Sequence, residues 1–373
     1  MEKMATLSAN EDLLFIGTYT TRGRGEGIYT YRFDRTTGAL ARVRTLAGLE
    51  NPSFLAVHPN RRYLYVAVEA LGREGAIAAL AIDPQTGELA PLGEQPSGGV
   101  DPCYVSVDPT GRLLLVANYG TGSVAAFPIG LDGRLGPASA FVQHAGPGSG
   151  VNPDRQEGPH AHCIIPDPTD RYALAADLGL DRIMIYRLDP AQGTLQPNAE
   201  PYAPTGAGSG PRHLAFHPND AWVYVSDELD STLSVFEFDP ARGHLRALQI
   251  LSTVPVGWQA AKGALPSGAN YPAHVQVAPS GWFVYASNRG HDSIAILAVD
   301  PDTGRLSTVG YQSTLGQWPR HFALDPGGNW LLAANQNSDN VVVFHIDQLT
   351  GQLTPAGPGV HVPSPVCVRF LNG

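Results

Sequence analysis

The sequence predicts an all-β protein that folds as a seven-bladed β-propeller of four-stranded blades. Three observations support this fold class. Short phrases recur seven times, the segments between them favour strands and turns, and the phrase order at the two ends allows the ring to close. The 42 glycines and 32 prolines among 373 residues agree with a chain of many turns and little helix.

The first recurrent phrase is a proline, two variable residues and then alternating apolar residues, which is typical of a strand. A variant copy runs through Gly158-Pro159-His160-Ala161-His162 and carries two extra residues. The other six copies begin at Pro52, Pro102, Pro211, Pro272, Pro319 and Pro365.

Two further phrases complete the repeat. The second is a tight turn and an apolar run, with ends at Thr18, Val68, Asn118, Asp177, Asp227, Asn288 and Asn335. The third is an x-Gly-x-Leu turn, in which glycine suits a positive φ, at Gly38, Gly87, Gly133, Gly193, Gly243, Gly304 and Gly351. One unit of 46 to 61 residues therefore holds four short strands, which make one propeller blade.

The phrase order at the termini predicts how the ring closes. The chain opens with a second phrase at residues 13–18 and ends with a first phrase at residues 365–370. The C-terminal strand would then complete the N-terminal blade and leave no open sheet edge. We expect residues 1–12 to form an N-terminal extension and residues 13–373 to form a single propeller domain.

Composition excludes several classes of partner. The chain carries 24 basic and 34 acidic residues, a net charge of −10, which argues against nucleic acid. No apolar run approaches the ~20 residues that a membrane helix needs, and the first residues do not resemble a secretion signal. Three scattered cysteines argue against a disulfide scaffold or a metal site. We therefore expect a cytoplasmic protein without a cofactor, and the sequence does not indicate an oligomeric state.

Candidate functional residues come from comparing the blades at one channel mouth. The start of each first phrase and the end of each second phrase should lie at the same channel mouth, because the two phrases form adjacent antiparallel strands. The Asn and Asp residues that end second phrases repeat around the ring, and we interpret most of them as ties between adjacent blades. Charged residues that do not repeat are better candidates, and these are Arg212, Arg289, Arg320, Glu228 and the pair His160 and His162. Three guanidiniums at one mouth of an acidic protein favour an anionic small molecule.

Two long junctions, residues 137–158 and 252–270, lead into first phrases and should overhang the same mouth. They contribute Arg155, Gln156 and Lys262 as polar groups. His213, His274 and His321 share one register and fit a packing role, although His213 and His321 also qualify as substrate contacts, as does Asn288.

Metal binding is the weaker interpretation of the same residues. The His160-x-His162 pair lacks an evident carboxylate partner, which makes zinc a poor candidate. Asp177, Asp227, Glu228 and Asn288 offer oxygen ligands for calcium, but a metal-free site is favoured.

Several segments resemble the signature of the propeller-type lactonase family. They are residues 148–162, 210–213, 226–230, 287–290 and 319–321, and the resemblance extends from Phe15 to the last strand. It implies a seven-bladed propeller. It also implies a catalytic set of Arg212, Glu228, Arg289 and a histidine, either His160 or His162.

The resemblance implies lactone chemistry and leaves three hypotheses open. The first is a carboxylic ester hydrolase acting on 6-phosphogluconolactone in the pentose phosphate pathway. Glu228 or His162 would be the general base, and Arg212 and Arg289 would stabilise the oxyanion or hold the carboxyl end. Arg320, Arg155 and His160 would hold the phosphate.

The second hypothesis is a cycloisomerase that closes a carboxymuconate-type diacid. The third is a non-catalytic binding scaffold, which a flat apolar mouth would favour over a deep cationic pocket.

Overall fold

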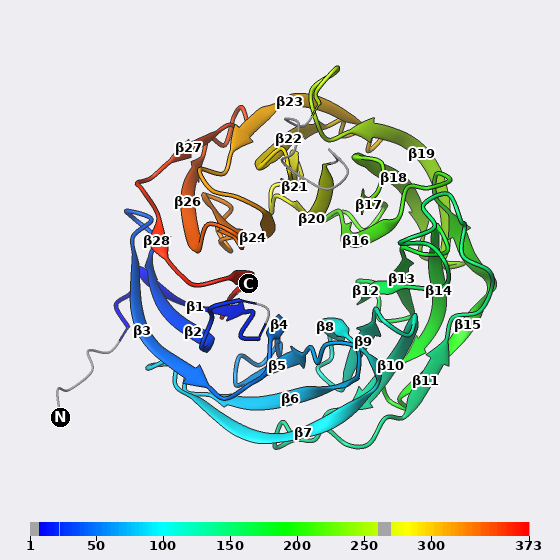
Figure 1. The fold of residues 1–373 in the computed structure, drawn as a ribbon, viewed down its shortest axis with the longest axis horizontal. Helices are drawn as coiled ribbons and strands as arrows, with labels where there is room; N and C mark the ends of the chain where they lie inside the picture. The colour runs from blue at the N-terminus through cyan, green and yellow to red at the C-terminus, as the bar shows by residue number, and fades with distance from the viewer. Residues whose placement is uncertain (1–6, 22, 260–269, 373) are drawn as a thin grey trace.

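Seven β-sheets are arranged as blades around a central channel (Figure 1). The computed structural model describes residues 7–21, 23–259 and 270–372, and these contain strands and turns without an α-helix. The predicted all-β, seven-bladed propeller is confirmed. None of the described segments forms a helix long and apolar enough to cross a membrane.

Each blade begins at the channel with a first-phrase strand. These innermost strands are β29 (Pro365–Phe370), β4 (Pro52–Val57), β8 (Pro102–Val107), β12 (Ala161–Pro166), β16 (Pro211–Phe216), β20 (Tyr271–Val277) and β24 (Pro319–Leu324). The second strands are β1 (Glu11–Thr18), β5 (Tyr63–Val68), β9 (Leu113–Asn118), β13 (Tyr172–Asp177), β17 (Trp222–Asp227), β21 (Phe283–Arg289) and β25 (Trp330–Asn335).

The outer half of each blade is formed by two more antiparallel strands. The third strands are β2 (Gly27–Asp34), β6 (Glu74–Ile82), β10 (Ser123–Pro128), β14 (Arg182–Asp189), β18 (Thr232–Asp239), β22 (Ser293–Val299) and β26 (Asn340–Ile346). The outermost are β3 (Leu40–Ala47), β7 (Leu89–Val100), β11 (Ala140–Gln143), β15 (Thr194–Pro204), β19 (His244–Ser252), β23 (Leu306–Ser313) and β27 (Leu353–Pro355). One blade departs from four strands, because β28 (Val360–His361) also pairs with β26.

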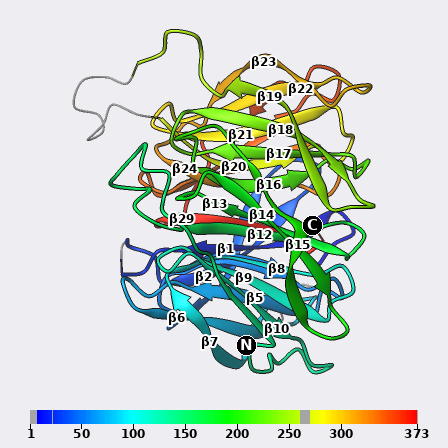
Figure 2. The same ribbon diagram turned by 90° about the vertical axis from the view of Figure 1, so that its right-hand side faces the viewer.

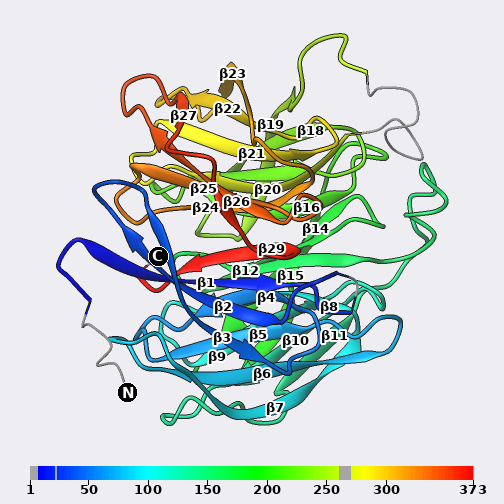
Figure 3. The ribbon, with the colours of Figure 1, turned by 60° about the vertical axis from the view of Figure 1, so that its left-hand side comes forward.

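The two ends of the chain share one blade, as predicted. β29 pairs antiparallel with β1, with Leu14 opposite Phe370 and Ile16 opposite Val368 (Figure 3). This pairing closes the ring, because β2 and β3 continue the same sheet on the other side of β1. β1 begins at Glu11, two residues before the start expected for the propeller domain.

The glycine turns lock adjacent blades together. Gly304 has a φ of 68°, and a Cβ at this position would lie 2.3 Å from the indole of Trp222 in the preceding blade. The hydroxyl of Tyr224 also donates to the Gly304 carbonyl at 3.0 Å. Glycine is therefore required here both by the backbone conformation and by the close approach of an aromatic ring.

Polar strand ends tie neighbouring blades, as the sequence suggested. The Asn288 side chain donates through Nδ2 to the backbone carbonyl of Thr253 at 2.7 Å, and Asn335 donates to Thr314 at 3.1 Å. In each pair the acceptor lies at the end of the preceding blade. These amides therefore satisfy buried backbone groups at the blade junctions.

Two junction segments extend beyond the same face of the ring, namely the one before β12 and the one after β19 (Figure 2). This agrees with the expectation that both overhang one channel mouth. Lys262, the polar group expected from the second junction, lies outside the described residues.

Candidate active site

A repeated β-bulge directs side chains into one mouth of the channel. In six blades the pairing between the first two strands shifts register around the residue that follows the first-phrase proline or its equivalent, Ala161. A bulged residue leaves the ladder, and the bend re-aims its side chain. The bulge residues are Ser53, Cys103, His162, Arg212, Arg320 and Val366.

A second set of side chains lies at the ends of the second strands. The residues one position beyond the second-phrase ends in four blades are Glu69, Tyr119, Glu228 and Arg289. Together with the bulge residues Cys103, His162 and Arg320 they surround a cavity of about 330 Å³, whereas Arg212, predicted as a site residue, is not among the lining residues. Its lining is Glu69, Asp101, Cys103, Tyr119, Arg155, His162, Glu228, Arg289 and Arg320.

Glu228 lies at the centre of an arginine cluster. Its Oε2 is 2.7 Å from both Nε of Arg212 and Nη2 of Arg289, and its Oε1 is 2.7 Å from Nη2 of Arg155. Burial alone would raise the pKa of Glu228, but the three guanidiniums outweigh it and hold that pKa well below its usual range. Glu228 is therefore a carboxylate at neutral pH.

The arginines keep their charge under strong burial. Desolvation and repulsion from Arg289 lower the pKa of Arg212 to about 9, which still leaves it protonated at neutral pH. The Arg289 guanidinium lies 5.4 Å over the ring of Trp318, and its Nε donates to the Tyr271 carbonyl at 3.1 Å. These contacts fix the direction in which Arg289 faces the cavity.

Arg320 is arranged differently from the other three guanidiniums. It lies 5.3 Å over the Tyr19 ring and forms no ion pair within the described part of the chain. Burial tends to lower its pKa, but nearby Tyr19 and Glu69 raise it on balance. Arg320 is thus a charged group that can bind an anion without first breaking an ion pair with a carboxylate.

His162, and not His160, lines the cavity. Desolvation and the nearby charge of Arg212 lower the pKa of His162 well below its usual value, so the imidazole is neutral at neutral pH. The His160 ring instead stacks on Tyr119 at 4.6 Å, and its Nε2 lies 2.9 Å from Oε1 of Glu157. His160 therefore supports the wall of the cavity from outside.

Two predicted substrate contacts have other partners. Gln156 is fully buried, and its Nε2 donates to Oδ1 of Asp181 at 2.7 Å and to the Leu178 carbonyl at 2.9 Å. It holds the loop that delivers Arg155 to the cavity. Asn288 joins two blades, as described above, and does not line the cavity.

The predicted histidines of the inner strands close the channel beneath the cavity. Nδ1 of His213 lies 2.9 Å from Nδ1 of His274, whose ring stacks on His321 at 3.9 Å. Phe54 and Tyr104 stack at 4.0 Å and contact the same layer. His213 and His321 therefore form the floor of the channel and are not part of the cavity lining.

Four lining residues were not predicted from the sequence: Glu69, Asp101, Cys103 and Tyr119. Three of them occupy the same two registers as the chosen residues, so the register alone could have identified them. The carboxylates change the expected electrostatics, because Glu69, Asp101 and Glu228 offset much of the arginine charge. The mouth is thus a site of mixed charge, where the sequence predicted a local cationic well that also held Glu228.

The residues considered as metal ligands do not converge. His160 and His162 point to different partners, and within residues 7–21, 23–259 and 270–372 no three His, Cys, Asp or Glu side chains are arranged to hold a metal ion.

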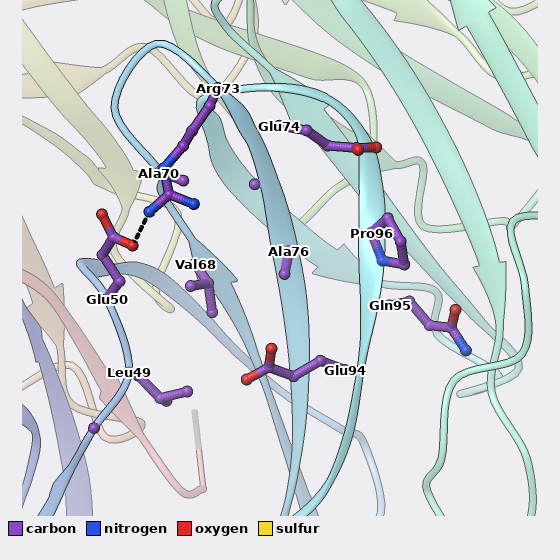
Figure 4. A pocket seen from close by; sticks show the side chains of 12 residues that line it. Leu49, Glu50, Val68, Ala70, Arg73, Glu74, Ala76, Glu94, Gln95 and Pro96 are labelled. Atoms are coloured by element: carbon purple, nitrogen blue, oxygen red, sulfur yellow. Dashed lines mark hydrogen bonds and ion pairs between the residues drawn. The ribbon is translucent and has the colours of Figure 1, made fainter.

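Another pocket, of about 430 Å³, shares no lining residue with the cavity. Figure 4 shows Arg73 paired with Glu50 at its rim and Glu94 at another side. The Arg73 side chain is 63% exposed, so this groove lacks the desolvated charges of the channel mouth.

Known proteins are similar to this chain over almost its whole length. The family model "Lactonase, 7-bladed beta-propeller" matches residues 13–370. A 6-phosphogluconolactonase of Bacillus subtilis is 38% identical over 96% of this chain and 98% of the relative.

Solved structures give the same result. A Bacteroides fragilis protein superimposes with a TM-score of 0.89 at 33% identity, covering 98% of this chain and 99% of its own. A periplasmic gluconolactonase of Pseudomonas aeruginosa, PpgL, superimposes with a TM-score of 0.88 at 35% identity, covering 96% and 99%. The repeat, the closed ring and these matches agree, and the chain belongs to the lactonase family of seven-bladed β-propellers.

Proposed function

We propose that this protein is a carboxylic ester hydrolase that converts 6-phosphogluconolactone to 6-phosphogluconate. The observation that carries the proposal is a neutral imidazole, His162, in a cavity that also holds Arg155, Arg289 and Arg320. Its volume of about 330 Å³ lies at the lower end of the range of small-molecule sites, ~300–1,000 Å³. A relative at 38% identity that is named 6-phosphogluconolactonase supports the same activity.

His162 is the general base in this proposal. It takes a proton from water as the water oxygen adds to the lactone carbonyl carbon, and the carbonyl electron pair moves onto its oxygen. When the intermediate collapses, the ring C–O bond breaks and the imidazolium returns the proton to the leaving oxygen. The product is an open-chain hydroxy acid, and His162 is again neutral.

The arginines supply electrostatic stabilisation. Arg155 and Arg289 face the cavity and can donate to the oxyanion as charge develops on it. Glu228 is a poor candidate for the base, because both of its carboxylate oxygens are already held in ion pairs with guanidiniums. Its role is to compensate and orient the guanidiniums, since it contacts three of them at 2.7 Å.

Arg320 binds the phosphate. It has no competing ion pair among the described residues, and a charged hydrogen bond to a phosphate oxygen is stronger than one between neutral groups. The phosphate of the substrate is thereby held away from the Glu228 cluster, which leaves the lactone carbonyl for His162.

Glu69 and Asp101 favour a sugar over a muconate-type diacid. Carboxylate oxygens accept hydrogen bonds from sugar hydroxyls, but they repel carboxylates of a substrate. A polyhydroxylated lactone with one anionic end fits this mixed lining better than a molecule with several carboxylates. The carboxylates therefore argue for hydrolysis over cycloisomerisation.

The test is a direct assay on freshly generated 6-phosphogluconolactone, with spontaneous hydrolysis subtracted. We expect rapid formation of the acid, slower turnover of gluconolactone and no consumption of carboxymuconate. The variant His162→Gln should lose ~10²–10⁴-fold in rate, the usual contribution of a positioned base. Inertness toward both lactones together with consumption of carboxymuconate would overturn the proposal. The cytoplasmic location expected from the sequence stays a prediction.

A further inference from the structure

The sulfur of Cys103 lies beside the candidate base. Cys103 and His162 occupy the same bulge position in adjacent blades, on β8 and β12, so their side chains meet at the channel wall. The distance from Sγ to Nδ1 of His162 is 3.6 Å, and both residues line the cavity. Nothing in the hydrolysis scheme above uses this contact.

The surroundings of Cys103 determine which partner donates. Its Sγ lies 3.5 Å from the carbonyl oxygen of His162 and 3.8 Å from the carbonyl oxygens of Ala117 and Ala161. Carbonyl oxygens can only accept, so they take the S–H proton. Among the described residues, the group left to donate to the sulfur is Nδ1–H of His162.

The other ring nitrogen of His162 has a different environment. Nε2 has no hydrogen-bond partner within the described residues, and it is not among the polar atoms sealed from solvent, so it opens to the cavity. The guanidiniums of Arg212 and Arg320 act on this ring. Positive charge near the ring disfavours the doubly protonated imidazolium, so His162 carries a single ring proton.

We propose that Cys103 is a positioning residue that fixes the tautomer of His162, with the proton on Nδ1 and the lone pair of Nε2 presented to the cavity. The consequence for catalysis rests on the proposed function, but the tautomer itself does not. Burial raises the pKa of Cys103, which keeps it a thiol and leaves its lone pairs available as a weak acceptor.

The tautomer matters because a neutral imidazole has one donor and one acceptor nitrogen. Only an unprotonated Nε2 can take a proton from water. The opposite tautomer would present an N–H group to the cavity and could not act as the base. The partner of the remote nitrogen thus decides whether His162 is competent.

The test is ¹⁵N NMR of the histidine rings in the full-length protein without substrate, with His162→Gln to identify the His162 signals. We expect wild-type His162 to show a protonated Nδ1 and an unprotonated Nε2. Cys103→Ala removes the acceptor and should shift the ring toward a mixture of tautomers. Cys103→Ser keeps an atom that both donates and accepts, and it should restore the wild-type signals.

Activity provides the second readout. In metal sites, loss of the group that orients a histidine lowers affinity or activity by ~10–100-fold. We expect Cys103→Ala to lower kcat/KM by about the same factor, and Cys103→Ser to recover most of the lost rate. Cys367→Ala removes another fully buried cysteine on a different blade, and it should leave the rate and the His162 signals unchanged.

A wild-type His162 with its proton on Nε2, or an unchanged tautomer in Cys103→Ala, would overturn the inference. The NMR measurement needs no substrate, so it tests the tautomer independently of activity. If the protein hydrolysed no lactone, the proposed function would be contradicted, but the tautomer would still be decided by the NMR result.

Discussion

Glu228 and Arg212 form an ion pair that is almost entirely buried. Nε of Arg212 lies 2.7 Å from Oε2 of Glu228, and the two side chains are 2% and 4% exposed. Arg155 and Arg289 bind the same carboxylate, so one negative charge compensates several positive ones. Such a cluster is stable only while every charge has its partner.

The first prediction concerns the removal of that carboxylate. Glu228→Gln leaves Arg212 and Arg289 buried without a counter-charge, and loss of one partner from a buried pair costs about 3–5 kcal/mol of unfolding free energy. Urea denaturation at pH 7.5 measures the loss.

The control is Glu237→Gln, which breaks the exposed pair between Glu237 and Arg246, whose side chains are 46% and 62% exposed. An exposed pair contributes at most about 1 kcal/mol. If Glu228→Gln proves no more destabilising than Glu237→Gln, Glu228 does not have the compensating role argued here.

The second prediction concerns acid and the channel floor. Burial lowers the pKa values of His213, His274 and His321 well below the usual value. The charge of Arg212 acts in the same direction on all three, and that of Arg369 on His274 and His321. In the unfolded chain these imidazoles protonate below about pH 6.5, whereas in the folded protein they stay neutral. The unfolded state then binds more protons, so stability is complete above pH 6.5 and falls as the pH drops below it.

From pH 7.5 to pH 5.5 each of the three imidazoles should cost about 1.4 kcal/mol, a total of about 4 kcal/mol of unfolding free energy. Urea denaturation at several pH values measures this slope. His274→Gln should remove about 1.4 kcal/mol of this pH-dependent loss, whereas His345→Gln, at an exposed position, should not change it. Equal stability at pH 7.5 and pH 5.5 would show that the floor histidines titrate normally.

The repeat explains why so much could be predicted from the sequence. Proline and glycine act locally and recur in each blade, so the strand order, the ring closure and the registers that reach the mouth followed from the spacing alone. Glu228, Arg289 and the pair His160 and His162 were selected this way, because each departs from its equivalents in the other blades.

The remaining features depend on contacts that no local pattern encodes. Arg155 reaches Glu228 only because of the path of its loop, and Gln156, the next residue, points into that loop instead. His160 and His162 were not distinguished, since the choice depends on stacking between His160 and a tyrosine from another blade, Tyr119.

The third prediction separates phosphate binding from catalysis. Arg320→Gln removes one charged contact, which is worth ~1.5–3 kcal/mol, so KM for 6-phosphogluconolactone should rise by ~10–100-fold. KM for gluconolactone, which has no phosphate, should stay nearly unchanged. Steady-state assays on both lactones provide the measurement.

Arg73→Gln is the matched control for this substitution, because Arg73 lies in the groove of Figure 4 and not in the cavity. It should leave both KM values as in the wild type. An equal rise of KM for the two lactones in Arg320→Gln would mean that Arg320 does not bind the phosphate.

The fourth prediction concerns Trp318, whose backbone is strained. The residue before the first-phrase proline has a positive φ in five blades, and four of them use Asn51, Asp101, Gly210 or Ser364. The fifth has Trp318 at a φ of 65°, which costs a bulky residue about 1–2 kcal/mol. The cation–π contact between the Trp318 indole and the Arg289 guanidinium, at 5.4 Å, offsets this strain energy.

Trp318→Asn should therefore separate stability from substrate binding. Asparagine tolerates the left-handed conformation, so relief of strain compensates the lost ring contact, and the unfolding free energy should change by less than about 1 kcal/mol. Arg289 loses the ring that orients it, and kcat/KM should fall, while Trp318→Phe keeps a ring and should retain most of the rate. If Trp318→Asn is as active as the wild type, the strained tryptophan does not position Arg289, and the backbone strain at this blade has no catalytic purpose.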